Sequence, residues 1–171
     1  MSPYSAHGGK SSSSRDDIAR MPHSRLAVKA LIPRRDDEAL LVRRTPFSGS
    51  ANPLKYGTPG GAVEQGETLI EGLRREVAEE TALEVAVEGI LGIREWNSVR
   101  HGAHYVCVFF ACRLVNNNPA VSLNHEHCEY IWATSAHLPN LDLMDSQREI
   151  VQEYLNVRSH VILPYKMPLQ K

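Results

Sequence analysis

The chain has 171 residues, of which 42% are hydrophobic and 23% are charged; this suits one globular domain and excludes wholesale disorder. Because 19 Lys and Arg residues stand against 20 Asp and Glu residues, the net charge is -1, which excludes a global field that would recruit nucleic acid or an anionic membrane. An anionic substrate must therefore be held by local positive charge or by a metal. No apolar run approaches the roughly 18 residues of a membrane span, the first residues lack the apolar stretch of a signal peptide, and three cysteines are too few for a disulfide framework. We expect a cytoplasmic, reducing setting.

The composition changes at both ends of a central domain, which we expect to span residues 23–160. Residues 1–22 are rich in Ser, Gly and other polar residues and lack apolar periodicity, which predicts a disordered tail without a function of its own. Residues 161–171 are expected to form a C-terminal extension.

The first predicted elements of the domain are strands. Apolar residues alternate along 26–32 and return along 39–42, which predicts two strands joined by a charged turn at 34–37. Residues 45–55 contain Pro, Gly, Ser and Asn, which predicts a long surface loop, and loops of that length in compact domains are often functional.

A Gly-rich turn at 58–61 precedes a predicted helix over 67–81. Thr68 is the expected N-cap, and Glu71 at the N3 position completes a capping box. The apolar residues that give this helix one buried side recur at helical spacing: Leu69, Ile70, Leu73 and Val77.

The rest of the domain is predicted to be mostly β. Residues 83–93 and 105–114 are β-rich, the polar segment 94–104 predicts an extended hairpin tip between them, and 130–132 predicts a short strand. A closing helix is expected over 146–157. The interleaved strands and helices, without internal repeats, predict one mixed α/β (α+β) domain.

Three carboxylates fall on one face of the predicted helix. At about 100° per residue, Glu76, Glu79 and Glu80 lie within an arc of roughly 100°, where like charges at i,i+3 and i,i+4 repel one another. Arg74 and Arg75 could offset part of this repulsion. A divalent cation would offset it better, because Mg²⁺ prefers carboxylate oxygens and leaves its other positions to water and substrate phosphates.

The alternative is a solvated acidic face, which is what most charge runs form. It would not explain why the turn Pro59-Gly60-Gly61 leads into this helix. A backbone so permissive can bring a carbonyl oxygen and amide groups close to a metal or a phosphate. The two adjacent features together favour a metal site.

Residues 61–83 resemble the box of the Nudix hydrolase family. That box reads Gly, five residues, Glu, seven residues, Arg-Glu, an aliphatic residue, one residue, Glu-Glu, one residue, Gly and an aliphatic residue. Its positions are filled here by Gly61, Glu67, Arg75, Glu76, Val77, Glu79, Glu80 and Leu83. The one departure is Ala82, where the family has Gly. A motif with so many fixed positions is highly specific, and the flanking strands, the glycine turn and the closing helix extend the resemblance over most of 25–158.

The resemblance implies a Nudix fold, a mixed β-sheet sandwiched between helices (α/β/α), and hydrolysis of a diphosphate linkage in a nucleoside diphosphate joined to another group. It implies that Glu79 and Glu80 bind Mg²⁺, or Mn²⁺ in its place, with help from the backbone carbonyl of Gly61. Glu76 would hold or deprotonate the attacking water, or bind a further metal. Arg75 would orient Glu76. Glu76, Arg75 and Glu79 are thus the implied catalytic residues. Metal ions would neutralise the diphosphate charge and lower the pKa of a bound water.

Two further positions of the box concern structure. Glu67 is expected to fix the junction between loop and helix. Gly just after a helix commonly adopts the left-handed conformation, which costs Ala roughly 1–2 kcal/mol, so Ala82 implies either a different helix end or some loss of stability. Because residue 82 supplies no ligand, this departure is not expected to abolish activity.

A second cluster, at residues 124–132, resembles the Glu-His pair that many Nudix proteins carry before a short strand ending in Trp. Family members often supply a further acidic group from this region. Glu126 is therefore the candidate additional metal ligand, with Glu129 second, and a polar loop without a ligand is the alternative. The His and Cys residues here match no closed zinc spacing, so zinc is not expected.

Three residues outside the box are candidates for substrate binding. Arg44 resembles a position from which family members contact a substrate phosphate, with a solvated Arg43–Arg44 pair as the alternative. Trp96 and Arg100 lie on or near the hairpin, where a base could stack on an aromatic or guanidinium plane. Ordinary hydrophobic cover is the alternative for Trp96.

The substrate class is inferred by elimination. Subfamilies acting on ADP-ribose and on diadenosine polyphosphates carry a Pro or a Tyr marker roughly 15–17 residues after the box, where this sequence has Ser98, Val99 and Arg100 instead. This favours a MutT-like activity on (deoxy)nucleoside triphosphates, with nucleotide sugars next. Two alternatives remain open: a catalytically silent nucleotide-binding or regulatory module, and an RNA-processing, decapping-like enzyme, against which the lack of net basic charge speaks. A homodimer is also left open, since no feature of the sequence defines an interface.

Overall fold

The computed structural model describes residues 23–47, 52–98, 102–116 and 119–156. In chain order the elements are β1 (His23–Leu31), β2 (Ala39–Arg44), β3 (Tyr56–Gly57), α2 (Leu69–Thr81), β4 (Val85–Ser98), β5 (Ala103–Leu114), β6 (His127–Ala133), the 3-10 helix η1 (Leu138–Asn140) and α3 (Asp145–Asn156). Within these ranges no helix is long and apolar enough to cross a membrane. The tail and the extension expected from the sequence lie outside the described residues.

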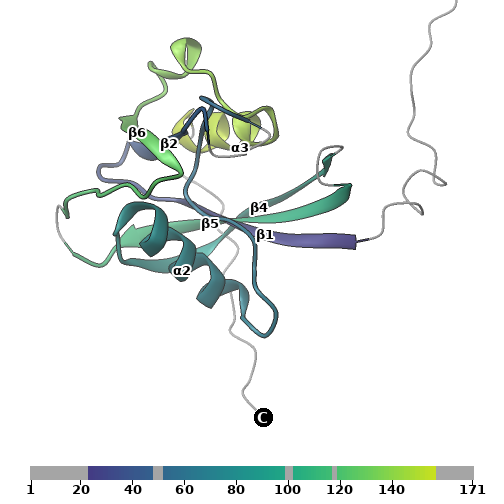
Figure 1. The fold of residues 1–171 in the computed structure, drawn as a ribbon. Coiled ribbons are helices and arrows are strands. Elements are labelled where there is room, and N and C mark those ends of the chain that lie inside the picture. The colour runs from purple at the N-terminus through teal and green to yellow at the C-terminus, as the bar shows by residue number, and fades with distance from the viewer. Residues whose placement is uncertain (1–22, 48–51, 99–101, 117–118, 157–171) are drawn as a thin grey trace, which may run out of the picture.

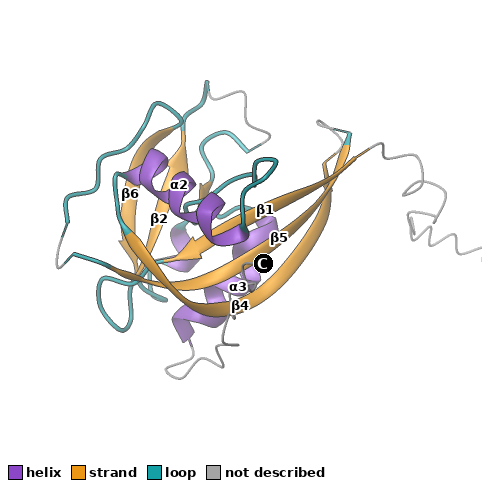
Figure 2. Cartoon of the chain, turned by 90° about the horizontal axis from the view of Figure 1, so that it is seen from below, coloured by secondary structure: helices purple, strands orange, loops and turns teal. Residues whose placement is uncertain are grey.

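The strands form two sheets of three strands each. In the first sheet β5 is central: β1 runs parallel to it, with Val28 beside Val108, and β4 runs antiparallel to it. In the second sheet β2 is central and antiparallel to both β3 and β6, with Leu40 opposite Trp132. Figure 2 shows β1, β5 and β4 side by side as one long, twisted sheet.

The first sheet is sandwiched between the two long helices, with α2 on one face and α3 on the other (Figure 1). Alternate residues of β5 enter two separate cores, because a strand directs successive side chains to opposite faces. Phe109 packs in one core with Ile150 of α3, whereas Phe110 packs in the other with Leu73 of α2. The predicted arrangement of a mixed sheet between helices is therefore confirmed.

The hairpin between β4 and β5 differs from the prediction. Strand β4 continues to Ser98 and β5 begins at Ala103, so the prediction of a hairpin tip over 94–104 is wrong for most of that segment. Trp96 stacks on Tyr105 across the two strands, with 5.4 Å between the ring centroids. Cross-strand pairs of this kind stabilise an antiparallel ladder, and they extend the strands through a segment whose mean polarity suggested a loop.

Helix α2 begins as predicted. The Thr68 hydroxyl accepts a hydrogen bond from the Glu71 N–H at 3.2 Å, and the Glu71 carboxylate accepts one from the Thr68 N–H at 2.8 Å, which confirms the capping box. At the other end Ala82 adopts the left-handed conformation, with φ 56° and ψ 19°, and donates its N–H to the Ala78 carbonyl at 2.9 Å. The helix thus ends as it would with Gly, and Ala82 bears the conformational cost.

Candidate active site

The C-terminal half of α2 carries a buried carboxylate, Glu80, which is 3% exposed. It lies one turn beyond Val77, on the face that packs against the sheet. The Gly60 N–H donates a hydrogen bond to Oε2 of Glu80 at 2.7 Å. Burial raises the pKa of Glu80, while the charge of Lys29 and the hydrogen bond from Gly60 favour the ionised form. Helix and turn are thus joined at this carboxylate.

The turn that faces Glu80 is fixed to strand β1 by backbone hydrogen bonds. Ala30 donates its N–H to the Pro59 carbonyl and Val28 donates its N–H to the Gly61 carbonyl, both at 2.9 Å. Gly60 has a φ of 125°, and a Cβ at that position would collide with the backbone of β1, so only glycine fits there. The Gly61 carbonyl oxygen keeps a second lone pair for another ligand.

Glu76 lies against the same turn. A Cβ added to Gly61 would lie 2.6 Å from Oε1 of Glu76, closer than two such atoms can approach. The carboxylate therefore fills the space that a side chain at position 61 would need. This close approach sets oxygen atoms of helix α2 directly beside the Gly61 backbone.

Arg75 holds three carboxylates of the box. Its Nε and Nη2 donate to the two oxygens of Glu67 at 2.7 and 2.9 Å, and its Nη1 lies 2.9 Å from Oε1 of Glu76 and 3.4 Å from Oε2 of Glu79. The guanidinium also donates to the Ala62 carbonyl at 3.1 Å. The hydrogen bonds from Arg75 lower the pKa of Glu67 to about 2. Arg75 thus links Glu67, before the helix, to two carboxylates of α2, while the structural role of Glu67 and the orienting role of Arg75 stay predictions.

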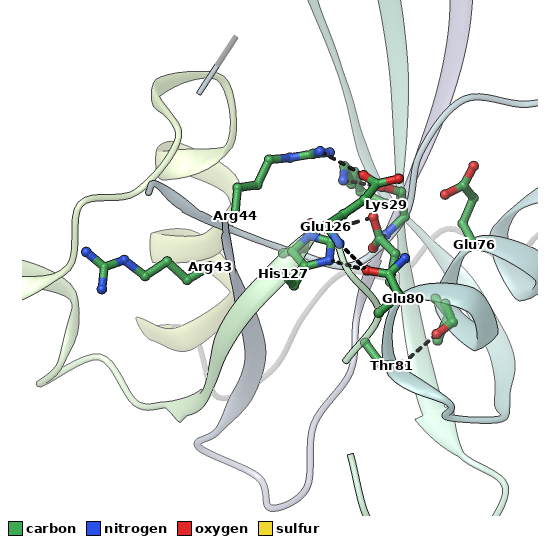
Figure 3. Close-up of polar contacts among 12 residues, drawn as sticks. Lys29, Arg43, Arg44, Glu76, Glu80, Thr81, Glu126 and His127 are labelled. Carbon is green, nitrogen blue, oxygen red and sulfur yellow. Dashed lines mark hydrogen bonds and ion pairs between the residues drawn. The ribbon is translucent and has the colours of Figure 1, made fainter. Parts of the chain in front are cut away.

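The structure does not gather the expected metal ligands around one point. Among the described residues, no three His, Cys, Asp or Glu side chains are placed together so as to hold a metal ion. Glu76 and Glu79 are turned toward Arg75, whereas Glu80 is turned toward Gly60, and Figure 3 shows Glu76 pointing away from Glu80. The donor set nevertheless fits Mg²⁺, because carboxylate and carbonyl oxygens are the ligands it prefers. The Glu79 side chain is 57% exposed and can rotate.

A second group of charges lies beside Glu80 and comes from β2 and from the loop before β6. Arg44 pairs with Glu126 at 3.0 Å, and the Asn124 N–H donates to the Glu80 carbonyl at 3.3 Å, which ties the loop to α2. Figure 3 shows Arg44 and Glu126 together beside Lys29 and Glu80. Two residues predicted from the sequence, Arg44 and Glu126, thus lie near the C-terminal half of α2.

Two other candidates from the sequence, Glu129 and Trp96, lie away from this charged group. Glu129 pairs with Arg43 at 3.1 Å, and Figure 3 shows Arg43 pointing away from the charged group. Trp96 stacks on Tyr105 and packs against the core beside α3, so its contact with a base stays a prediction. Arg100 lies outside the described residues.

His127 is a buried neighbour of Glu80 for which the sequence predicted no role. It is 6% exposed, its Nδ1 lies 3.2 Å from Oδ1 of Asn124, and its Nε2 lies 3.8 Å from Oε1 of Glu80. Because an amide oxygen only accepts hydrogen bonds, Nδ1 carries the proton. Burial lowers the pKa of His127 to about 3, and the nearby cations Arg44 and Lys29 act in the same direction.

Lys29 of β1 is a second buried neighbour that was not predicted from the sequence. It is 8% exposed, and its ammonium donates to the Gly60 carbonyl. The signal that could have found it is its place within the run 27–32, whose other residues are all apolar. A lysine in such a strand needs a partner, because burying an unpaired charge is costly.

Comparison with known proteins finds one matching family model and several relatives of similar sequence. The family model of the NUDIX domain matches residues 23–154. The chain is 27% identical over 135 residues to a protein named ADP-ribose pyrophosphatase from Methanocaldococcus jannaschii, covering 78% of this chain and 74% of that protein. It is 30% identical over 105 residues to a protein named nucleoside triphosphatase NudI from Enterobacter sp. (strain 638), covering 56% of this chain and 73% of that protein.

The solved structures that resemble this chain include MutT and NUDIX hydrolase proteins. The MutT protein from Methanosarcina mazei Go1 matches with 29% identity and a TM-score of 0.67, over 77% of this chain and 92% of that chain. A NUDIX hydrolase from Nitrosomonas europaea, at 24% identity and a TM-score of 0.67, covers 83% of this chain and 93% of its own length and shares the fold. The chain therefore belongs to the NUDIX hydrolase family.

Proposed function

We propose that the chain is a divalent-metal-dependent pyrophosphohydrolase that cleaves a diphosphate bond in a nucleoside diphosphate joined to another group. One observation carries the proposal. Two carboxylates of α2, Glu76 and Glu80, lie against a glycine turn that accepts no side chain, and Glu79 follows on the same helix, in a chain of the NUDIX family.

The residues that would hold Mg²⁺, or Mn²⁺ in its place, are Glu79, Glu80 and the carbonyl oxygen of Gly61, with Glu126 as a further candidate. When bound, the metal would neutralise charge on the diphosphate and lower the pKa of a coordinated water. Glu126 is paired with Arg44 at 3.0 Å, and Arg44 is one of the charges that act on Glu80. A ligand role for Glu126 would therefore require it to exchange that partner.

Arg75 and Glu76 would position the attacking water. Arg75 donates to Glu76 at 2.9 Å while it also pairs with Glu67, which fixes the Glu76 carboxylate beside Gly61. A carboxylate held in this way can accept a hydrogen bond from a water and then its proton. Arg44 is proposed to bind a substrate phosphate, because its side chain is 20% exposed at the site and a guanidinium matches phosphate geometry.

For the substrate class, we propose a (deoxy)nucleoside triphosphate first and a nucleotide sugar next. The similarity to a protein named nucleoside triphosphatase, at 30% identity, supports the first class. The similarity to a protein named ADP-ribose pyrophosphatase, at 27% identity over a longer stretch of this chain, adds ADP-ribose to the substrates to be tested, even though the Pro marker of that subfamily is absent.

The test is product analysis by chromatography with Mg²⁺ present. Triphosphates, oxidised triphosphates, ADP-ribose, nucleotide sugars and dinucleoside polyphosphates are each offered to the wild type, to Glu79→Gln and to Glu84→Gln. Glu84 is an exposed glutamate just beyond α2, so its variant is the matched control. We expect the wild type and Glu84→Gln to release a nucleoside monophosphate equally well. Glu79→Gln should turn over at least about 100-fold more slowly, because removing even an outer-shell partner of a metal ligand can cost up to about 100-fold.

The remaining alternatives have distinct outcomes in the same experiment. A folded wild-type chain that binds nucleotides without hydrolysing any of them would identify a binding or regulatory module. Turnover of capped RNA alone, with binding that weakens steeply as salt is raised, would identify an RNA-processing enzyme. Full activity in Glu79→Gln would show that the metal site is wrongly assigned.

A further inference from the structure

Strand β1 buries a cation that the proposed reaction does not use. Lys29 is 8% exposed, and its neighbours Val28 and Ala30 are fully buried. Removing an ammonium group from water costs several kcal/mol unless a hydrogen bond and an opposite charge compensate it. Burial lowers the pKa of Lys29, which is the direction expected for a charge held in such a place.

Gly60 links this lysine to Glu80. The Gly60 carbonyl accepts a hydrogen bond from the Lys29 ammonium, and the Gly60 N–H donates to Oε2 of Glu80 at 2.7 Å. One peptide unit on each side of Gly60 is therefore held by a charged side chain, one from β1 and one from α2. Since the Gly60 backbone also lies too close to β1 for any side chain, the turn has little freedom to move relative to either partner.

The charges of Lys29 and Glu80 compensate each other. Among the charged groups that act on Lys29, Glu80 contributes most to keeping the ammonium ionised, and Lys29 does the same for the Glu80 carboxylate. Arg44 acts in the opposite sense on Lys29, because the two cations repel. Figure 3 draws Lys29 and Glu80 together at the centre of the charged group.

We propose that Lys29 is a positioning residue for the site on α2: its ammonium holds the Gly60 carbonyl and supplies the positive charge that keeps Glu80 in place beside the turn. The inference rests on the proposed function in that it treats Glu80 and the neighbouring Gly61 carbonyl as metal ligands. It gives Glu80 a counter-charge supplied by the protein itself. Without Lys29, a divalent cation would have to supply that charge.

The first test is a double-mutant cycle on the full chain in EDTA, with Lys29→Met, Glu80→Gln and the double variant. Lys29→Met leaves a buried carboxylate without its main counter-charge, so we expect the melting temperature to fall by about 10 °C. Neutralising Glu80 should recover a large part of that loss, because no charge then needs compensation. If Lys29→Met caused the same loss in the wild type and in the Glu80→Gln variant, the inference would be overturned, since Lys29 would then act by packing alone.

Lys55→Met is the matched control. Lys55 pairs with Asp145 at 3.1 Å on the surface, and exposed ion pairs of this kind contribute little. Its substitution should leave the melting temperature within about 2 °C of the wild type. If Lys29→Met does not fold, recovery of a folded chain in the double variant supports the inference, and failure of the double variant to fold overturns it.

The second test adds Mg²⁺ to the same variants and records the shift in melting temperature. We expect a larger upward shift in Lys29→Met than in the wild type, because the ion replaces a missing positive charge. An equal or smaller shift would contradict the proposed role. The two proposals fail separately. If the double-mutant cycle shows no coupling between Lys29 and Glu80, the positioning role of Lys29 is rejected even if the wild type hydrolyses nucleotides. If the cycle shows coupling but the wild type hydrolyses no substrate, the proposed function is rejected and the interaction between Lys29 and Glu80 still stands.

Discussion

The two ends of α2 are stabilised in different ways. At the N-terminal end, Thr68 and Glu71 satisfy each other's backbone groups, and Glu67 receives two hydrogen bonds from Arg75. At the C-terminal end, Glu80 is buried and depends on residues of distant segments, and Ala82 adopts a left-handed conformation that favours glycine. The first end is stabilised by residues close in the sequence, whereas the buried carboxylate at the second end depends on the turn and on strand β1.

The C-terminal end of α2 is the end that lowers the stability of the folded chain. A buried carboxylate and a left-handed alanine each cost free energy, and such costs persist where the surrounding structure enforces them. The carboxylates of the proposed site occupy the costly end of the helix. The N-terminal end of α2 follows the usual capping rules for a helix. The C-terminal end, which carries the proposed metal ligands, departs from the residue preferences expected at a helix end.

The largest expected effect comes from Gly60, which contacts the C-terminal half of α2 through its hydrogen bond to Glu80. Gly60→Ala should lower the free energy of unfolding by about 3 kcal/mol or more, because a Cβ there meets the backbone of β1. Gly66→Ala is the matched control: its φ is 91°, but no atom lies within 4 Å of the new Cβ, so we expect a loss of only about 1 kcal/mol. Urea unfolding measures both. Similar losses would mean that the turn is not held tightly against β1.

Thr68→Ala tests the N-terminal end. It removes the side-chain acceptor of the capping box, so the free energy of unfolding should fall by about 1 kcal/mol. Thr68→Ser keeps the acceptor and should stay within a few tenths of the wild type. A stable Thr68→Ala variant would show that tertiary packing, rather than the cap, fixes where the helix begins.

Ala82→Gly tests the C-terminal end and should act in the opposite direction. Glycine relieves the left-handed strain, worth roughly 1–2 kcal/mol, and loses about half of that to its greater freedom in the unfolded chain. We expect a small rise in melting temperature without any change in which substrate is used. A lower melting temperature would mean that Ala82 is not strained in its left-handed conformation.

The pH dependence of stability tests the pair of Glu67 and Arg75. Because the pKa of Glu67 is about 2 in the folded chain against an ordinary value of 4.5, the unfolded state binds more protons between these values. The stability that Glu67 contributes is therefore present above pH 4.5 and is lost as the pH falls toward about 2. Glu67→Gln should show a shallower loss of stability in that window, measured by urea unfolding. Parallel curves for the two proteins would contradict the low pKa.

Much of the fold follows from local patterns in the sequence. The capping box fixes the start of α2, and the alternation of apolar residues locates β1 and β2 within a few residues. The extension of β4 to Ser98 could not be predicted, because it depends on the cross-strand stack of Trp96 on Tyr105. Nor does local pattern show that β1 pairs in parallel with β5, a strand far along the chain.

The candidate site is predictable in its residues more than in its geometry. The spacing of Glu76, Glu79 and Glu80 places them on α2, but it cannot show that Arg75 draws two of them away from the third. That arrangement depends on which cations and N–H donors the fold brings near. The contact of Lys29 with the Gly60 carbonyl is likewise a product of tertiary structure.

The most direct test of the central claim is the binding of Mn²⁺, followed by electron paramagnetic resonance, to the wild type, Glu80→Gln and Glu84→Gln. If the C-terminal half of α2 and the glycine turn form a metal site, the wild type and Glu84→Gln bind Mn²⁺ with equal affinity. Glu80→Gln should then bind it roughly 100-fold more weakly. Equal affinity in all three proteins would contradict the claim, because the buried carboxylate would then contribute nothing to holding the ion.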